Sequence, residues 1–256
     1  MLSIIIPLLL LNINYIYNLY DYLSIEYSTK DIFIIGTTIL NIVVYWSLGL
    51  LYLSIDLYPK FLSKYKIQPS INPIYTNPGE IYSIVKLVSF NQLIITPLCC
   101  LVLYNYMTFS NTIPTAFIVL HDIIVSTIAT EFVFYYSHRL LHIPYLYKSI
   151  HQIHHIYRAP MAITALYTHP IEYVISNIFP IVIGPIICKS HIITIWIWQI
   201  IALTNTITSH SGYNFFNYKA LSGDSHDIHH MRYKYNYGVL NILDYLHGTL
   251  YKPDDL

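Results

Sequence analysis

The segment HRLLHIPYLYKSIHQIHH, residues 138–155, holds five histidines in two short blocks. A third block, HDIHH at residues 226–230, repeats the spacing of the second block. Residues three or four positions apart lie on one face of a helix, so each block would present its imidazoles together. Neutral imidazole binds iron, zinc and copper, and eight histidines exceed the four ligands of one tetrahedral ion. The three blocks therefore predict a site for two metal ions.

The composition around these blocks is typical of a membrane protein. Of the 256 residues, 55% are hydrophobic and 10% are charged, whereas soluble domains carry about 25% charged residues. The formal net charge is zero, which argues against nucleic acid as a partner. The three cysteines form no CxxC pair, so they predict neither a disulfide framework nor a thiolate metal site.

Long uncharged segments predict membrane-spanning helices. The hydrocarbon core of a bilayer is crossed by about 20 apolar helical residues. On this basis we expect spans at about residues 32–55, 87–106 and 115–136, with a further candidate span at residues 1–20. The sequence therefore predicts an all-α integral membrane protein.

The later apolar segments predict a hairpin that returns the chain to the side of the histidine blocks. Residues 173–188 and 190–209 are separated only by Lys189, and the hairpin would dip into the bilayer or cross it. By the positive-inside rule that side is cytosolic, because it carries basic residues next to the predicted spans: Lys60, Lys64, Lys66, Lys86, Arg139, Lys148 and Arg158. His210 and the third block would join the first two blocks in a cytosolic, histidine-rich helical cap.

Three polar residues near the blocks are candidates for supporting the metal ligands. A metal-bound histidine usually donates its second ring N–H to a carboxylate or carbonyl. Glu131 lies seven residues before His138, on the same helix face, and Asp227 lies inside the third block. A bond to a neighbouring helix for Glu131 and a solvated position for Asp227 are equally good interpretations. His169, which precedes Pro170, would line the site or cap a helix.

The histidine pattern leaves other classes of protein open. HDIHH also reads as His-Asp-x-x-His, a variant of a zinc hydrolase motif, although three blocks oversupply one zinc ion. A metal transporter would place its ligands near the middle of the bilayer across several spans, whereas these blocks lie at span ends. His121 and Asp122, within the third span, would pair with each other or contact a substrate. A metal-binding lipid protein without catalytic activity is a further alternative.

The order HRLLH, HQIHH, HDIHH resembles that of the fatty acid hydroxylase and sterol desaturase superfamily of membrane di-iron oxidases, over residues 131–249. Three flanking segments are similar to the sterol C-4 methyl oxidase branch and to fatty acid hydroxylase domain proteins: YTHPIEYVISNIFPIVIGP at 167–185, SHSGYN at 209–214 and YGVLNILDYLHGT at 237–249. The resemblance implies an N-terminal membrane region, 1–115, and a fatty acid hydroxylase-type catalytic domain, 116–256.

The resemblance also implies which residues bind metal. Two iron ions would be held by nine histidines, namely His138, His142, His151, His154, His155, His210, His226, His229 and His230. Some relatives have a further histidine four residues after the position of His210, where this chain has Asn214. Either Asn214 contributes through its oxygen or a water, or the ligand set is one shorter.

The implied activity is the O2-dependent oxidation of an unactivated C–H bond in a lipid. C-4 methyl oxidation of a sterol is the first expectation, with fatty-acid or sphingolipid hydroxylation and sterol desaturation as alternatives. Electrons would come from NAD(P)H through cytochrome b5 and its reductase, because the sequence shows no haem or flavin domain of its own. The implied location is the endoplasmic reticulum membrane.

Overall fold

The computed structural model describes residues 13–58, 62–68, 78–215 and 224–252. The regular secondary structure in these ranges is helical, apart from one isolated β-bridge between Lys66 and Tyr213. The prediction of an all-α fold is confirmed.

Five helices are long and apolar enough to cross a bilayer, and the chain is an integral membrane protein. Three of the five contain a short π-helical turn, a wider turn that is common at functional sites. In chain order the spans are α3 (Thr29–Asp31) with η1 (Ile32–Gly36) and α4 (Thr37–Leu57); α6 (Pro78–Phe90) with η4 (Asn91–Ile95) and α7 (Thr96–Tyr104); α8 (Ala116–Leu141); α10 (Pro170–Glu172) with η7 (Tyr173–Ile178) and α11 (Phe179–Cys188); and α12 (Ile192–Ser209).

Two helix boundaries differ from the sequence-based expectation. The second span was expected to begin near residue 87, but its helix begins at Pro78. The charge of Lys86 ends the hydrophobic segment without ending the helix, because an exposed lysine is a good helix former. Most of the candidate span at residues 1–20 lies outside the described residues, and Ile13–Glu26 forms α2, whose 14 residues alone are too few to cross a bilayer.

The third span, α8, is defined at both ends by its sequence. The hydroxyl of Thr115 accepts a hydrogen bond from the backbone N–H of Ile118 and caps the first turn. The helix ends at Leu141, and Pro144 two residues after the His142 cap prevents its continuation. This boundary places His138 and His142 at the end of the span.

The hairpin of α11 and α12 packs closely on α8. A Cβ atom built on Gly184 of α11 would lie 2.3 Å from the Cα of Ser126 in α8, so only glycine permits this approach. The two helices are joined at Lys189, whose φ of 52° gives the left-handed turn of a helix C-terminus. The chain thus returns from this turn along α12 to His210, as the hairpin prediction requires.

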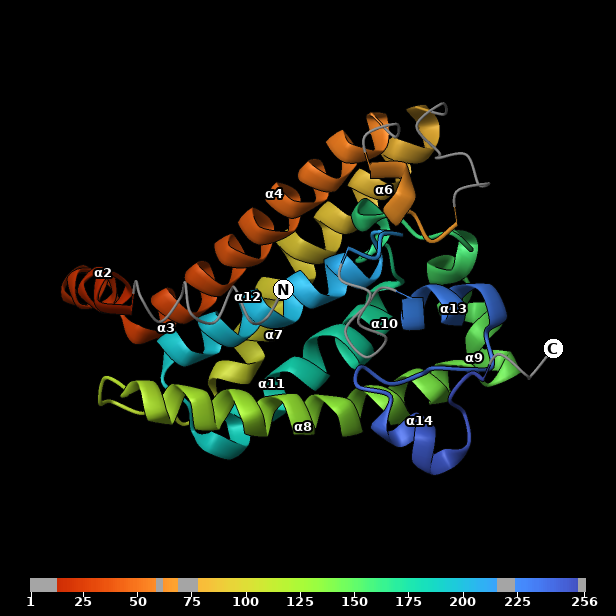
Figure 1. The fold of residues 1–256 in the computed structure, drawn as a ribbon. Coiled ribbons are helices and arrows are strands. Elements are labelled where there is room, and N and C mark those ends of the chain that lie inside the picture. The colour runs from red at the N-terminus through yellow and green to blue at the C-terminus, as the bar shows by residue number, and fades with distance from the viewer. Residues whose placement is uncertain (1–12, 59–61, 69–77, 216–223, 253–256) are drawn as a thin grey trace.

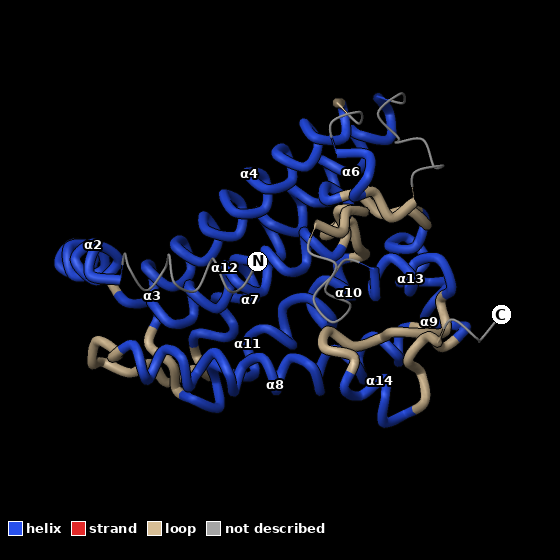
Figure 2. The backbone as a smooth tube through the Cα atoms, viewed as in Figure 1, coloured by secondary structure: helices blue, strands red, loops and turns tan. Residues whose placement is uncertain are grey.

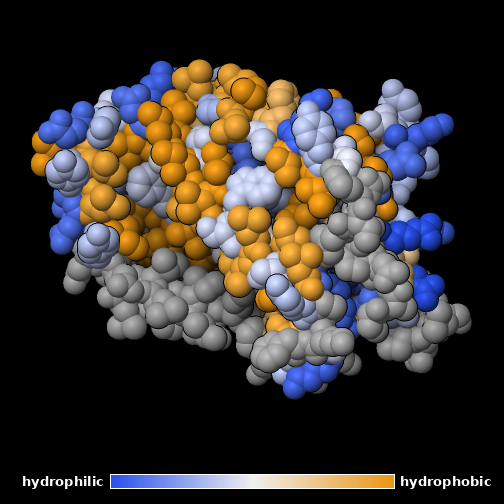
Figure 3. Space-filling model, turned by 90° about the horizontal axis from the view of Figure 1, so that it is seen from above, coloured by the Kyte–Doolittle hydropathy of each residue, from blue (hydrophilic) through white to orange (hydrophobic). Residues whose placement is uncertain are grey.

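The short helices that carry the later histidines gather at one end of the spans. Figure 1 shows α4, α8 and α12 running between the same two ends of the molecule, with α9 (Pro144–Ser149), α13 (Asp224–Arg232) and α14 (Ile242–His247) at one end. Figure 2 shows that loops concentrate at these two ends. Figure 3 shows a hydrophobic band between hydrophilic ends, the surface expected of a protein in a bilayer.

The segment between the first two spans is attached to the histidine-bearing end. Lys66 forms a 2.6 Å ion pair with the buried Asp56, and the Tyr213 hydroxyl donates to the same carboxylate oxygen at 2.7 Å. The side chain of Gln68 donates to the carboxylate of Asp227 in α13. The short η2 turn (Ser63–Tyr65) therefore holds the third histidine block against the spans.

Candidate metal centre

The nine predicted histidines form two groups at the end of the spans. Within each group the ligand nitrogens lie within 4.8 Å of one another. The first group contains His138, His142, His151, His155 and His229. The second group contains His154, His210, His226 and His230.

The second and third blocks each contribute to both groups. Residues 151–156 form a 3₁₀ helix, η5, rather than an α-helix. His151 and His155 belong to the first group, whereas His154 belongs to the second. In α13, His229 joins the first group and His226 and His230 join the second. The expectation that each block presents its histidines together holds for the first block but is wrong for these two. Adjacent histidines point about 100° apart on a helix, so an HxxHH block can reach two sites.

Four nitrogens of the first group form a closed square. The Nε2 atoms are 3.0 Å apart for His142 and His151, 3.0 Å for His151 and His155, 3.2 Å for His155 and His229, and 3.1 Å for His229 and His142. Ligands at right angles around an ion with bonds of about 2.1 Å lie about 3.0 Å apart, whereas tetrahedral ligands lie about 3.4 Å apart. With His138 as a fifth member, the spacing fits an ion with more than four ligands.

The second group has the same spacing along three of its edges. The Nε2 atom of His210 lies 3.2 Å from that of His154 and 2.9 Å from that of His226. The Nε2 atoms of His226 and His230 are 3.1 Å apart. The two groups are therefore similar in how closely their nitrogens converge.

Backbone carbonyls fix the tautomer of four of these histidines. The Nδ1 atoms lie 2.7–3.1 Å from carbonyl oxygens: His138 from Tyr237, His210 from Thr206, His229 from Tyr235 and His230 from Tyr157. A carbonyl oxygen can only accept a hydrogen bond, so Nδ1 carries the proton. The Nε2 lone pair of each ring consequently points into its group.

Burial keeps these imidazoles neutral at physiological pH. Desolvation lowers the pKa of His142 to about 2 and that of His210 to about 4, with neighbouring histidines adding to the effect. The same causes hold the pKa well below its usual range for His151, His154, His155, His226, His229 and His230. Converging neutral lone pairs repel one another unless a cation lies between them. The donor set therefore fits metal ions that prefer nitrogen ligands.

Glu172, which the sequence interpretation missed, supports the first group. Its buried carboxylate oxygen Oε1 lies 2.8 Å from Nδ1 of His151. The carboxylate and the imidazole are within ion-pair distance without the angles of a hydrogen bond, and a carboxylate beside the second ring nitrogen is the neighbour expected of a histidine ligand. The signal in the sequence was an acidic residue at the start of an otherwise apolar span, in YTHPIEY.

Of its two expected roles, Glu131 takes the second, a bond to a neighbouring part of the chain rather than to a histidine ligand. The Nδ1 atom of His138 faces the Tyr237 carbonyl, and the buried Glu131 carboxylate instead accepts backbone N–H groups from Val239, Leu240 and Leu243 at 2.7–3.0 Å. Helical register placed Glu131 on the face of His138 but could not show that a backbone turn would occupy the space between them. Glu131 thus positions the turn that follows Tyr237.

The remaining three candidates lie around the two groups. Asp227 is buried rather than solvated, which raises its pKa to about 6, and it accepts a hydrogen bond from Gln68. His169 accepts a 3.2 Å hydrogen bond from the N–H of Ile171 and caps α10, one of its two expected roles. The side chain of Asn214 donates to Asp224 at 2.6 Å.

His121 and Asp122 lie near the start of α8, far along the helix from His138, and they pair with each other. Nδ1 of His121 is 3.0 Å from Oδ1 of Asp122, whose Oδ2 accepts a 2.7 Å hydrogen bond from Ser190. Cys188 completes this cluster of potential ligands. Mutual pairing accounts for its polar atoms.

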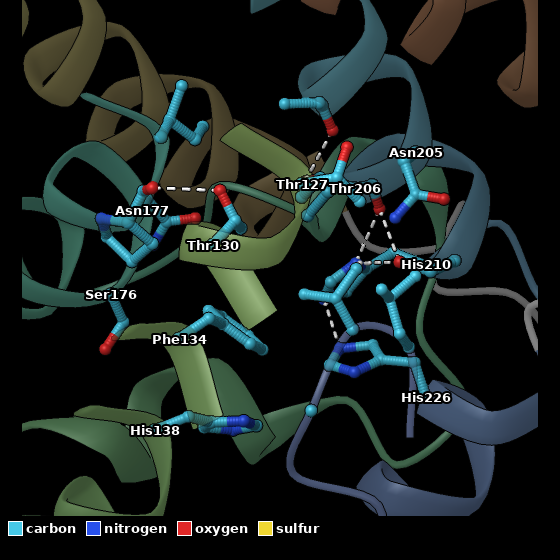
Figure 4. A pocket seen from close by; sticks show the side chains of 18 of the residues that line it. Thr127, Thr130, Phe134, His138, Ser176, Asn177, Asn205, Thr206, His210 and His226 are labelled. Atoms are coloured by element: carbon cyan, nitrogen blue, oxygen red, sulfur yellow. Dashed lines mark hydrogen bonds between the residues drawn. The ribbon is translucent and has the colours of Figure 1, made fainter. Parts of the chain in front are cut away.

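A cavity of about 140 Å³ leads from the histidines into the membrane-spanning region. Figure 4 shows Thr130, Phe134 and His138 of α8 facing Asn205 and His210 of α12 across it. A smaller cavity of about 70 Å³ adjoins the first, since both are lined by Asn177, Ile181 and Thr206. The two cavities thus extend from the histidines into the interior of the membrane-spanning region, and their walls are mostly apolar.

Comparisons with known proteins agree with this geometry. The fatty acid hydroxylase family matches residues 123–249. Fatty acid hydroxylase domain-containing protein 2 of Homo sapiens is 37% identical over 226 residues, which cover 85% of this chain and 67% of that protein. Methylsterol monooxygenase 2-2 of Arabidopsis thaliana is 33% identical over 224 residues, covering 82% of this chain and 81% of that protein.

A third relative carries a different activity in its name. Very-long-chain aldehyde decarbonylase GL1-8 of Oryza sativa subsp. japonica is 33% identical over 246 residues, covering 90% of this chain and 89% of that protein. No solved structure matches the chain.

Proposed function

Because the chain belongs to the fatty acid hydroxylase superfamily of di-iron-type oxidoreductases, we propose that it uses O2 to oxidise an unactivated C–H bond of a membrane lipid. One observation carries the proposal. Two groups of buried, neutral imidazoles direct their lone pairs inward at the point where a cavity from the membrane region ends. A transporter would instead need ligands along a path across the bilayer.

We propose that the two groups are the ligands of two iron ions, with His138, His142, His151, His155 and His229 holding one and His154, His210, His226 and His230 the other. Bound iron would supply the oxidation chemistry that protein side chains lack. The chain's own residues hold the ligands in place. Carbonyls and Glu172 orient the rings, and the apolar cavity holds the substrate and limits access of water.

A sterol is the substrate class that we favour, with oxidation of its C-4 methyl group as the reaction. Support comes from the relative named methylsterol monooxygenase and from the adjoining cavities, which suit an extended apolar molecule. Hydroxylation of a fatty acid or sphingolipid, or desaturation of a sterol, would use the same site. These reactions begin with removal of the same kind of hydrogen atom, and the position of the substrate decides between them.

Electrons would reach the site from a separate donor, with cytochrome b5 and its NAD(P)H-dependent reductase as the proposed pair. Exposed cations surround the histidine-bearing end, including Arg139, Lys148, Arg158, Arg232 and Lys234. They suit an acidic partner and agree with a cytosolic position for this end. We propose the endoplasmic reticulum as the membrane.

Iron content and lipid oxidation together test the proposal. The purified protein should contain two irons per chain, and replacing His154 and His229, one from each group, with Ala should abolish O2-dependent product formation. His247→Ala is the control, since His247 is exposed and bonds to Tyr136 rather than joining either group. Full activity in the double variant would overturn the assignment.

Complementation identifies the substrate class. Expression in cells that lack sterol C-4 methyl oxidase should remove the methylsterols that these cells accumulate. If methylsterols persist while the protein is present and iron-loaded, the sterol assignment fails and a fatty-acyl or sphingolipid substrate takes its place.

A further inference from the structure

The hydroxyl side chains that line the larger cavity already have partners in the protein. Hydroxyl groups in its wall donate hydrogen bonds to backbone carbonyls or to other side chains: Thr127 to Ile123, Thr130 to Pro180, Thr206 to Ala202, Ser209 to Thr206, Ser176 to Ser137 and Ser225 to Asn241. These hydroxyls contribute to the structure and offer little to a ligand.

Two carboxamides in the same wall are different. Asn177 of η7 and Asn205 of α12 line the cavity, and neither side chain forms a hydrogen bond with a described residue. Both lie in membrane-spanning segments, where water is scarce and an unpaired amide is costly. Polar residues kept in such a position usually serve a ligand.

The two carboxamides lie at a similar depth from the metal centre. Asn205 precedes His210 by five residues, and Asn177 follows Glu172, the partner of His151, by five residues. In α12 five residues span about 7–8 Å, whereas Asn177 lies in the π-helical turn η7. Figure 4 shows the two side chains on different sides of the cavity, with Asn205 beside His210 and Asn177 beside Thr130.

We propose that Asn205 beside His210 and Asn177 across the cavity provide a hydroxyl-binding subsite, in which either amide can bond to a substrate hydroxyl close to the carbon that is oxidised. The proposal rests on the proposed function for the reaction and names the feature that a substrate must have. In a 4-methylsterol the 3-hydroxyl is on the carbon next to the one that bears the methyl group. A methyl group at the histidines would therefore place this hydroxyl within reach of the carboxamides, while Phe134, Ile181 and Trp198 contact the ring system.

The subsite would discriminate against a lipid without such a hydroxyl. An analogue that lacks it leaves two amides unpaired in an apolar wall, and a site built to bind a hydroxyl rejects such analogues strongly. A hydrocarbon chain oxidised far from its polar end would leave the same two amides unpaired.

Equilibrium binding to the iron-loaded protein in lipid nanodiscs, without O2 or an electron donor so that no oxidation occurs, tests the subsite separately from catalysis. The probes are a 3β-hydroxy-4,4-dimethylsterol and its 3-deoxy analogue. We expect the hydroxysterol to bind the unsubstituted protein at least about tenfold more tightly, the effect of one or two net hydrogen bonds. In the Asn177→Leu, Asn205→Leu double variant the two affinities should become equal.

Leucine is close to asparagine in size and removes a polar group from the membrane region, so the variants should fold. Each single variant provides a second test, because it should lose part of the preference for the hydroxysterol over the 3-deoxy analogue. Thr127→Val is the matched control, because the Thr127 hydroxyl already bonds to Ile123. An unchanged preference in the double variant, or equal affinities in the unsubstituted protein, would overturn the subsite. If neither sterol binds, the assignment of a sterol as the substrate is wrong, and the proposed subsite is wrong as well.

Discussion

Glu172 is the residue for which the geometry makes the sharpest prediction about metal binding. Its carboxylate lies 2.8 Å from Nδ1 of His151, the nitrogen that points away from the metal position. Glu172→Leu removes the carboxylate beside this ring, and loss of such a partner typically lowers metal affinity about 10–100-fold. Retention of iron against a chelator would measure the change.

Two further variants separate orientation from folding. Glu172→Gln keeps an oxygen that can accept from His151 and should retain most of the iron. Glu26→Leu, at an exposed glutamate of α2, should leave iron retention unchanged. If Glu172→Leu holds iron as tightly as the unsubstituted protein, Glu172 does not position a ligand.

Histidine spacing and the family resemblance indicated the nine histidines, but neither their division into two groups nor what orients them. Acidic residues were the natural candidates from the sequence, yet His138, His210, His229 and His230 face backbone carbonyls. Every residue has a backbone carbonyl, so no sequence pattern identifies the carbonyls that accept hydrogen bonds from the histidine ligands. The sequence could not decide between the two roles of Glu131 for the same reason, since its partners are backbone N–H groups of a distant turn.

Among the helices, the contact between α8 and α11 is the most sensitive to a single methyl group. Gly184→Ala would place a Cβ atom 2.3 Å from the Cα of Ser126, and backbone cannot move aside as a flexible side chain can. Overpacking usually costs about 1–3 kcal/mol, and a clash with backbone belongs at the upper end. Thermal unfolding in detergent should show a clearly lower Tm for this variant.

Gly49→Ala in α4 is the matched control for helix packing. A Cβ atom there would lie 3.4 Å from a side-chain methyl of Ile163, close to ordinary contact. Its Tm should stay near that of the unsubstituted protein. Equal Tm values for the two variants would show that α8 and α11 do not pack as closely as the structure has them.

The docking of α14 depends on Glu131. The carboxylate binds three backbone N–H groups in and before this helix, and leaving buried donors unpaired costs about 1–3 kcal/mol each. Glu131→Ala should increase hydrogen exchange in residues 238–250 while α12 stays protected. Unchanged exchange in residues 238–250 would show that other contacts hold α14.

At the level of helices, hydropathy predicted the spans and their order but not their internal geometry. Apolar length reports which segments suit a bilayer, and the expected spans at 32–55 and 115–136 lie within or close to the observed helices. It does not report hydrogen-bond register, so the π-helical turns and the 3₁₀ conformation of η5 were not predicted. The π-helical η7 is the element that carries Asn177 into the cavity wall.

For the molecule as a whole, the family match begins at residue 123, but the site depends on residues before it. Asp56 and Lys66 bind Tyr213, three residues after His210, and Gln68 binds Asp227. The hydroxyl of Tyr45 in α4 donates to the carbonyl of Ile163 at 2.6 Å. The proposed division at residue 115 therefore separates two parts of the chain that share a core. The sequence motifs could not reveal this shared core, because they lie in only one of the two parts.

Membrane orientation is the property of the whole molecule that charge distribution predicts. The histidine-bearing end carries seven exposed basic residues, namely Lys64, Arg139, Lys148, Arg158, Arg232, Lys234 and Lys252. The other end carries two basic residues, Lys30 and Lys189, together with the acidic residues Asp21, Glu26 and Asp31. The positive-inside rule then predicts that the histidines face the cytosol. In a cysteine-free background, a cysteine at position 234 should react with a membrane-impermeant maleimide on sealed microsomes, whose cytosolic face is outward. A cysteine at position 189 should react only after detergent is added.

Labelling of position 189 alone would reverse the orientation. Labelling of both would show that the α11 and α12 hairpin enters the bilayer without crossing it, because its turn and the metal centre would then share one side.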